Sequence, residues 1–330
     1  MGREWAELSA TISAVDAQWK ESARLTYRTA VIVRVHLWSV HHDRPTSWAC
    51  DKDNWDPRKR PRVLPDQSTM SRRMHGKHRK RFEAFLDALS EKLGQPLPRD
   101  NAPPQSSADI PPAEMPAQTT PPQAARPLEL VKILDGKPLP VAAHSQDQNA
   151  TWGRGAGQQA KGYKLHMVVS AKDDRPMPLQ WAVAPLGVDE RVIAPRLIKR
   201  LEGGGYLLAD SNYEATAVYR HSALANLQLF SPRKRVHVRN KAPMDKRRRC
   251  ASRVRGVEAL EPPANVNCFG PQVYRLRNKV ESALGNLTSF GGGLQGLPAW
   301  VRRIWRVRRW VYGKLLINAC RIRCRKAGHA

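Results

Sequence analysis

The pattern of hydrophobic residues changes its period near residue 128. Beyond this point, short apolar runs predict strands over residues 128–135, 162–170, 179–185, 206–210 and 227–230. Between the third and fourth runs, apolar residues at helical spacing predict a helix over 190–201, with Asp189 as its N-cap. This order of elements predicts a mixed sheet surrounded by helices, an α/β (α+β) architecture.

The first 95 residues show helical spacing instead. An apolar stretch at 30–40 and a periodic stretch at 82–93 predict two helices. Pro65 and Asp66 mark the start of another helix, which carries the polar residues Ser68, Ser71, Arg72 and Arg73. This pattern favours a small all-α domain of the helix-turn-helix kind, in which these four side chains enter a DNA major groove. A basic, solvated helix in an ordinary helical bundle explains the same residues.

A proline-rich segment separates these two patterns. Residues 96–127 contain 10 of the 26 prolines, mixed with Gln, Ser, Thr and Ala. Such a composition buries too little apolar surface to offset the entropy of an ordered chain. We therefore expect three parts: a helical domain at 1–95, a linker at 96–127 and a mixed-sheet domain with a basic, helical C-terminal region at 128–330.

The charge of the chain points to a polyanionic partner. Lys and Arg number 56 against 29 Asp and Glu, a formal net charge of +27. Residues 215–330 alone hold 25 basic and 4 acidic side chains. Such an excess favours double-stranded DNA as the partner and not a small-molecule substrate. The apolar stretch at 29–40 is too short to span a membrane and no secretory signal is recognisable, so we expect a cytoplasmic, nucleoid-associated protein.

Two basic features stand out in this C-terminal part. The clustered residues predicted to follow phosphates are Arg233, Lys234, Arg235, Arg247, Arg248 and Arg249. A final helix over about 298–325 combines an apolar face with many arginines. Core packing with a phosphate-binding outer face is the preferred interpretation of this helix, and a dimer interface is the alternative.

Three carboxylates are candidates for chemistry. Asp135 and Asp210 each end an apolar strand, and Glu281 is the only acidic residue after residue 261. Tyr274 and Arg277 lie at helical spacing from Glu281 and share its face. Three convergent carboxylates are the minimum that holds two Mg²⁺ ions for phosphoryl transfer. Arg277 is suited to clamp a phosphate, and Tyr274 to stack on a base or contact the DNA backbone.

Simpler roles explain the same residues. Asp135 and Asp210 are also typical turn-forming acids, and Glu281 also suits an ion pair with Arg277. His166 is more typical of a packed strand residue than of a catalytic group. The glycines between residues 153 and 157 are interpreted as a mobile loop near the site.

Four sequence blocks together carry a family resemblance. They are Ile-Leu-Asp135-Gly-Lys-Pro-Leu, Gly162-Tyr-Lys-Leu-His166, Leu-Leu-Ala-Asp210-Ser-Asn-Tyr213 and Tyr274-x2-Arg277-x3-Glu281. In this order they resemble insertion-sequence DDE transposases with the Tyr-Arg-Glu-Lys signature. The resemblance implies an RNase H-like catalytic fold, with Asp135 on the first strand, Asp210 after the fourth and Glu281 on the following helix. It also implies that the helical domain at 1–95 is a DNA-end-binding domain and that residues 128–330 form the DDE catalytic domain. Two Mg²⁺ ions per site, replaceable by Mn²⁺, and a homodimer on DNA are implied as well.

The chain departs from the family pattern at two positions. Thr288 stands where the signature has a basic residue, and Gly136 follows Asp135 where Ser or Thr is common in similar sequences. The sequence thus predicts a transposase that binds the inverted-repeat ends of its element and catalyses DNA cleavage and strand transfer. A catalytically inactive DNA-binding remnant and a structure-selective nuclease on the same fold are the alternatives.

Overall fold

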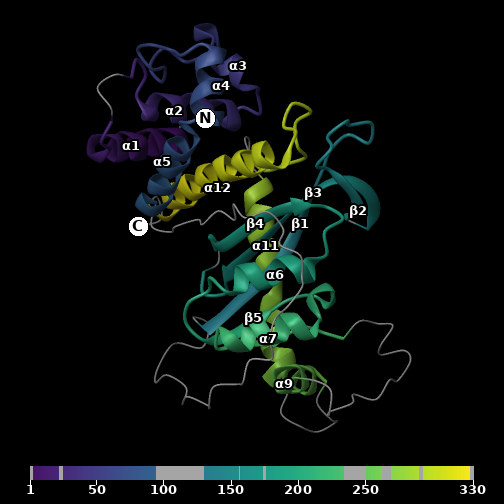
Figure 1. The fold of residues 1–330 in the computed structure, drawn as a ribbon. Helices are drawn as coiled ribbons and strands as arrows, with labels where there is room; N and C mark the ends of the chain where they lie inside the picture. The colour runs from purple at the N-terminus through teal and green to yellow at the C-terminus, as the bar shows by residue number, and fades with distance from the viewer. Residues whose placement is uncertain are drawn as a thin grey trace. The chain divides into compact units, whose positions relative to one another are not determined.

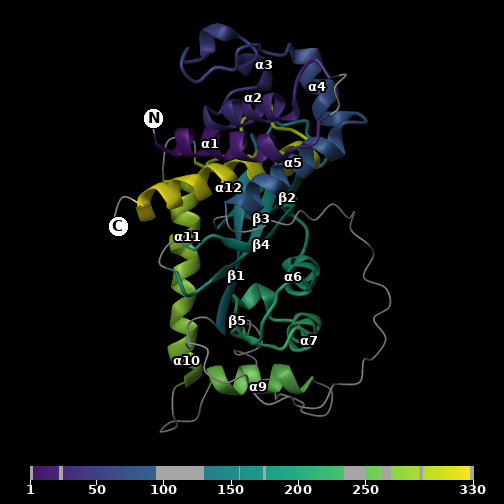
Figure 2. The same ribbon diagram turned by 90° about the vertical axis from the view of Figure 1, so that its left-hand side faces the viewer.

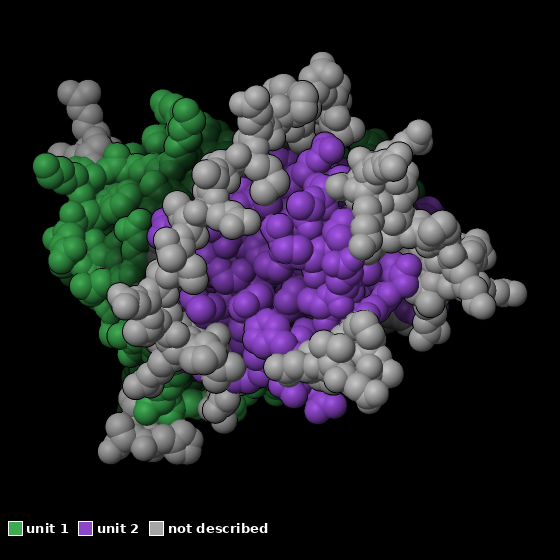
Figure 3. Space-filling model, turned by 90° about the horizontal axis from the view of Figure 1, so that it is seen from below, with its two compact units in different colours: residues 1–98, 140–150, 285–330 green, residues 99–139, 151–284 purple. Residues whose placement is uncertain are grey.

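A computed structural model describes residues 3–21, 25–93, 130–155, 157–173, 176–233, 250–261, 269–289 and 293–327. The chain divides into two compact units (Figure 3). The first comprises residues 1–98, 140–150 and 285–330, and the second comprises residues 99–139 and 151–284.

The second unit contains a mixed β-sheet. Its strands are β1 (Val131–Pro140), β2 (Thr151–Gly155), β3 (Gln158–Ser170), β4 (Pro178–Pro185), β5 (Gly205–Leu208) and β6 (Leu227–Phe230). The strand order is β2-β3-β1-β5-β6, and β4 also pairs with β3. The β1, β5 and β6 strands are parallel, whereas β3 and β4 are antiparallel. The expected mixed α/β architecture is therefore confirmed.

Helices cover both faces of this sheet. They are α6 (Glu190–Ile198), α7 (Thr216–Leu224), α9 (Ala251–Leu260), α10 (Phe269–Tyr274) and α11 (Asn278–Thr288). In Figures 1 and 2, α6 and α7 lie on one side of the sheet, and α10 and α11 lie on the other. Ile193 of α6 and Val218 of α7 pack in the core with Leu134, Val168 and Leu207 of the strands. This burial of apolar side chains fixes the helices on the sheet.

One strand of this sheet was not expected from the sequence. The glycine-rich stretch interpreted as a loop forms β2, which pairs antiparallel with the start of β3. Its sequence, Thr-Trp-Gly-Arg-Gly, has no apolar alternation, so the strand pattern is absent. Backbone pairing and not side-chain pattern defines this element.

The first unit is helical, as predicted for the N-terminal region. Its helices are α1 (Arg3–Gln18), α2 (Thr29–His41), α3 (Thr46–Ala49), η1 (Lys52–Asn54), α4 (Gln67–His75), α5 (Arg79–Lys92) and α12 (Ile304–Ala327). The N-terminal helix α1 was not predicted, although its buried residues Trp5, Leu8, Ile12 and Val15 have helical spacing. None of the helices within the described ranges has the length and apolar character required to cross a bilayer.

The C-terminal helix belongs to this helical unit, which differs from the expected domain boundaries. The α12 helix packs against α1 and α2 and was expected in the catalytic domain. Lys314 of α12 is buried and its Nζ lies 2.7 Å from Asp43. Arg309 donates to the Met74 carbonyl at 2.9 Å, and Tyr312 donates to the Leu86 carbonyl at 3.1 Å. These buried contacts explain why the arginine-rich helix completes the N-terminal core.

Buried histidines make the first unit sensitive to acid. Burial, aided by the nearby charge of Arg309, lowers the pKa of His36 from 6.5 to about 3. His36 is therefore protonated near pH 6.5 in the unfolded chain, but only near pH 3 in the folded chain. Stability from neutral His36 is complete above pH 6.5 and falls as pH drops towards 3.

Between pH 6.5 and 4, we expect the unfolding free energy of His36→Leu to fall less than that of the wild type. Denaturant unfolding across this pH range measures the slope for the variant and the wild type. His144 is exposed, so His144→Leu serves as the control and should keep the wild-type slope. Equal slopes for all three proteins would show that protonation of His36 is not part of the acid response.

Candidate active site

Parallel pairing of β1 with β5 brings Asp135, on β1, level with Asp210, which follows β5. The register aligns Ile133 of β1 with Leu208 of β5, and each aspartate lies two residues beyond its aligned residue. This register brings the two carboxylates close together, with Asp135 within β1 and Asp210 just beyond the carboxyl end of β5. The sequence predicted both acids at strand ends, and this position holds for Asp210 but not for Asp135, because β1 continues to Pro140.

Asp210 is held by backbone contacts on both sides. Its carboxylate caps the short helix η3 (Ser211–Tyr213) by accepting the N–H of Asn212 at 2.9 Å. Its own carbonyl accepts a hydrogen bond from Ser231 Oγ at 2.6 Å. The Tyr274 hydroxyl donates to the carbonyl of the preceding residue, Ala209, at 3.0 Å. The position of Asp210 is thus fixed by β5, by the segment after β6 and by α10.

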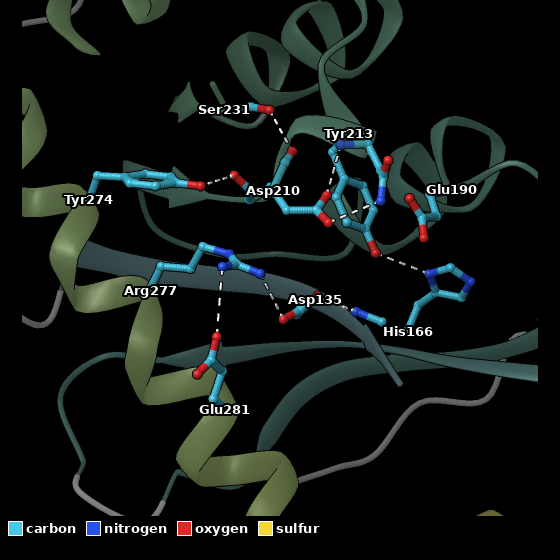
Figure 4. A network of polar contacts seen from close by, with 12 residues as sticks. Asp135, His166, Glu190, Asp210, Tyr213, Ser231, Tyr274, Arg277 and Glu281 are labelled. Carbon is cyan, nitrogen blue, oxygen red and sulfur yellow. Dashed lines mark hydrogen bonds and ion pairs between the residues drawn. The ribbon is translucent and has the colours of Figure 1, made fainter. Parts of the chain in front are cut away.

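The predicted helical face lies opposite the strand ends, although its helix is interrupted. A 3₁₀ turn, η4 (Arg275–Arg277), joins α10 to α11. The guanidinium of Arg277 lies between two carboxylates, as Figure 4 shows. Its Nη2 is 3.2 Å from Asp135 Oδ2, and its Nη1 is 3.9 Å from Glu281 Oε1. Arg277 therefore joins two of the three predicted acids, and the Glu281 side chain is 65% exposed whereas that of Asp135 is 13% exposed.

The surroundings of Asp135 favour its protonated form. Burial raises its pKa to about 6, and the charges of Asp210 and Glu190 add to this rise. The N–H of Gly136, 2.7 Å from Asp135 Oδ1, and the guanidinium of Arg277 oppose it. This excess of negative charge is what a bound cation would neutralise.

A second set of polar residues supports the acids, and sequence reasoning assigned it no joint role. The ring of buried His166 accepts or donates through Nδ1 to the Tyr213 hydroxyl at 3.1 Å. Lys164 Nζ forms an ion pair with Glu190 at the start of α6. Burial lowers the pKa of His166 to about 3 and raises that of Tyr213. His166 is therefore a packed, neutral strand residue, and a signal for this set lay in the Gly162–His166 and Asp210–Tyr213 blocks.

Steric crowding explains why a glycine, Gly136, follows Asp135. A Cβ at Gly136 would lie 2.9 Å from Lys164 Cδ and 3.3 Å from the Tyr213 hydroxyl. We expect Gly136→Ala to lower the unfolding free energy by about 1–3 kcal/mol, because the buried tyrosine cannot move aside. Chemical denaturation measures this loss.

A glycine with open surroundings provides the control for this substitution. At Gly285, within α11, a Cβ would meet no heavy atom within 4 Å. Gly285→Ala should therefore raise stability by about 0.5–1 kcal/mol through helix propensity. If Gly136→Ala were as stable as the wild type, the close packing of Lys164 and Tyr213 against Gly136 would be contradicted.

Comparison with known proteins assigns the family. Residues 126–302 match the family model described as "Transposase DDE domain", which covers more than half of the chain. The chain belongs to the DDE transposase family. The expected resemblance is thereby confirmed, as is the expectation of an enzyme that hydrolyses and transesterifies phosphodiester bonds. Enzymes of this family generally use divalent metal ions.

One solved structure was matched as a whole. It is a piggyBac transposase described as a "synaptic complex with hairpin DNA", determined by cryo-EM. The two chains are 10% identical with a TM-score of 0.42, over 97% of this chain and 72% of the other. No curated protein sequence matches the chain.

The donor atoms of the transposase site suit a divalent metal ion. Asp135, Asp210 and Glu281 supply carboxylate oxygens, the ligands preferred by Mg²⁺ and Mn²⁺. Across the described residues, no three His, Cys, Asp or Glu side chains are close enough to bind one metal together. Arg277 lies between Asp135 and Glu281, so this guanidinium provides the positive charge at the acids in the described conformation.

The residues predicted to read DNA from the helical unit divide into two kinds. Ser68, Ser71 and Arg72 are exposed on α4, whose first turn is capped by Asp66. Arg73 is buried, and its guanidinium donates to the Tyr27 carbonyl at 2.8 Å and to Thr29 Oγ1 at 3.1 Å. The prediction that Arg73 enters a groove does not fit this position, because its charge is used to join α4 to α2.

The basic cluster of the transposase is described only in part. Arg233 forms a two-pronged ion pair with Glu261, with its Nε 2.8 Å from Glu261 Oε1. Its charge is therefore already compensated within the fold. The other predicted phosphate contacts, Lys234, Arg235, Arg247, Arg248 and Arg249, lie outside the described residues.

Proposed function

We propose that the chain is an insertion-sequence transposase that binds the inverted-repeat ends of its element and catalyses DNA cleavage and strand transfer in the cytoplasm. The observation that carries this proposal is the parallel pairing of β1 with β5, which brings Asp135 of β1 close to Asp210 just after β5, while Arg277 joins Asp135 to Glu281. The match to the DDE transposase domain supports the same reaction class. The net charge of +27 suits duplex DNA.

Asp135, Asp210 and Glu281 would hold the divalent ions, which we expect to be two Mg²⁺, with Mn²⁺ as a substitute. When bound, such ions activate the attacking oxygen and stabilise the leaving oxygen of an in-line displacement. The carboxylates must be charged to bind them, and since the pKa of Asp135 is raised to about 6, metal binding at or below this pH releases a proton.

Arg277 and Tyr274 would position the scissile phosphate. Arg277 donates to Asp135 at 3.2 Å, and a non-bridging phosphate oxygen can replace that carboxylate as the acceptor. Tyr274 is anchored to the Ala209 carbonyl by its hydroxyl, so its ring is held beside Asp210. Both residues would orient the substrate and leave the acids available to bind the divalent ions.

The proposed reaction has two balanced steps. Water attacks the phosphorus at an element end and loses a proton to solvent, while the bond to the 3′ oxygen breaks and this oxygen takes up a proton from solvent, which leaves a 3′-hydroxyl and a 5′-phosphate. This 3′ oxygen then attacks a phosphorus of target DNA, and the target 3′ oxygen leaves. Because both ends of the element must react together, we propose a homodimer on DNA.

Two observations favour a second candidate, a DNA-binding transposase remnant. Thr288 replaces the basic residue of the signature, and its Oγ1 donates to the nearby Gly285 carbonyl at 3.1 Å. Glu281 is mostly exposed and lies beside Arg277. An RNase H-like nuclease that cuts without joining is the third possibility.

Labelled duplexes taken from both flanks of the coding sequence test these candidates. The proposal predicts cleavage that requires Mg²⁺ or Mn²⁺ and leaves a 3′-hydroxyl at the element end. Binding without cleavage under either metal would favour the remnant, and cleavage without joining would favour the nuclease.

A further inference from the structure

The unpredicted β2–β3 ribbon has two chemically different faces. The register pairs Trp152 with Lys161 and Arg154 with Gln159. Since directly opposed residues of an antiparallel pair share a face and neighbours along a strand alternate, these four side chains lie together. We call them the outer face of the ribbon, which extends beyond the rest of the sheet in Figure 1.

The opposite, inner face holds small residues that fix the ribbon to the catalytic unit. A Cβ on Gly153 would lie 2.7 Å from the Leu186 carbonyl oxygen, and a Cβ on Gly155 would lie 2.9 Å from Pro138 Cβ. The N–H of Gly187 donates to Thr151 Oγ1 at 2.7 Å. Glycine is therefore required for this close approach.

These anchors connect the ribbon to the segments that carry the acids. Pro138 lies on β1, three residues after Asp135, and Gly187 lies three residues before Glu190. The ribbon is consequently held by β1, which carries Asp135, and by the segment that leads to Glu190. The position of a partner bound to the outer face would therefore be fixed relative to Asp135 and Glu190.

The outer face is open and has the composition of a nucleic-acid contact. Trp152 is 58% exposed, and Arg154 and Gln159 are also exposed. Within the described ranges, no carboxylate forms an ion pair with Arg154. An exposed indole beside basic groups combines the stacking or apolar contact and the positive charge with which proteins bind nucleic acids. In a chain of net charge +27, the complementary partner is a polyanion.

We propose that the outer face of the ribbon binds duplex DNA, with Arg154 on a phosphate and Trp152 against base edges of the major groove. This inference rests on the proposed function and assigns it a contact surface beside the acids. A two-stranded ribbon fits the width of the major groove, where the indole meets apolar groups such as the thymine methyl. Arginine on the same face places a cation at the groove wall.

The two side chains have different signatures in a salt titration. Removal of a phosphate contact lowers the slope of log affinity against log salt concentration by about one, so Arg154→Ala should do this. Trp152→Ala should weaken binding by about tenfold and leave the slope unchanged, because it releases no counterion. Fluorescence anisotropy of the full chain with short labelled duplexes from the flanks of the gene measures both quantities.

Matched controls come from α7 in the same unit. Leu224 is exposed to a similar extent, 55%, and Arg220 is exposed on the same helix. Leu224→Ala and Arg220→Ala should keep the wild-type affinity and slope. Thermal unfolding of all four variants checks that the outward-facing substitutions leave the fold intact.

Three results would overturn the proposal. Variants of Trp152 and Arg154 that match their controls would show that the ribbon does not contact DNA. If Trp152→Ala instead changed the sedimentation of the free protein and not its DNA affinity, the outer face would bind a second copy of the chain. If wild-type protein failed to bind any duplex, the proposed function itself would fail, which separates this case from the other two.

Discussion

Replacing Asp210 with asparagine is expected to reduce DNA cleavage by at least about a thousandfold, because catalytic groups that act as a unit lose most of their effect together. The substitution keeps the shape of the side chain, and its amide oxygen can still accept the N–H of Asn212 that Asp210 accepts at 2.9 Å. The negative charge is lost, and with it a ligand for a hard cation. DNA affinity should remain close to that of the wild type.

Asp51 provides a matched control for this variant. It also caps a 3₁₀ helix, η1, by accepting the N–H of Asp53 at 3.0 Å, and it is exposed. Asp51→Asn should cut DNA at the wild-type rate in the presence of Mg²⁺. If Asp210→Asn retained more than a tenth of the cleavage rate, Asp210 would have no catalytic role.

The largest effect on stability is expected at the ion pair between Arg253 and Glu214. The Glu214 side chain is 1% exposed, and Arg253 Nε donates to its Oε1 at 2.7 Å. Arg253 also donates to Thr216 Oγ1 at 3.1 Å, so it connects α9 to the start of α7. Arg253→Ala removes this ion-pair partner of the buried carboxylate and should lower the unfolding free energy by about 3–5 kcal/mol. Denaturant unfolding measures this loss.

Arg255 on the same helix is the control, since it is exposed and contacts only the Gln228 side chain among its described partners, at 3.4 Å. Arg255→Ala should change stability by less than about 0.5 kcal/mol. Glu214→Gln should recover part of the loss in the Arg253→Ala background, because it removes the charge of the buried carboxylate. Equal losses for the two arginine variants would contradict burial of the pair.

The sheet and two of the acids could be predicted from local pattern, for a physical reason. Strands buried on both faces are apolar throughout, so the run before Asp135 and the run before Asp210 were recognisable without tertiary information. The aspartates interrupt these runs at their ends. Parallel pairing then brings them together, which a pattern of alternating helices and strands already favours.

The roles of individual arginines could not be predicted, because they depend on contacts with residues far away in the sequence. The arginines of α12 indicated a phosphate-binding surface, yet Arg309 is buried against Met74 in the N-terminal helices. Arg73 has the sequence context of a groove-reading residue, and only its contact with Tyr27 reveals a structural role. A local charge pattern cannot distinguish a solvated cation from one that is paired with a distant carbonyl.

The joining of a pre-cut element end to target DNA tests the central claim most directly. A labelled duplex that already carries a free 3′-hydroxyl at its end is incubated with wild-type protein, Mg²⁺ and plasmid DNA. The account predicts that label becomes covalently joined to the plasmid with wild-type protein and not with Asp210→Asn, although both proteins bind the duplex. Joining at equal rates by both proteins, or cleavage of the plasmid with no joining by the wild type, would contradict it.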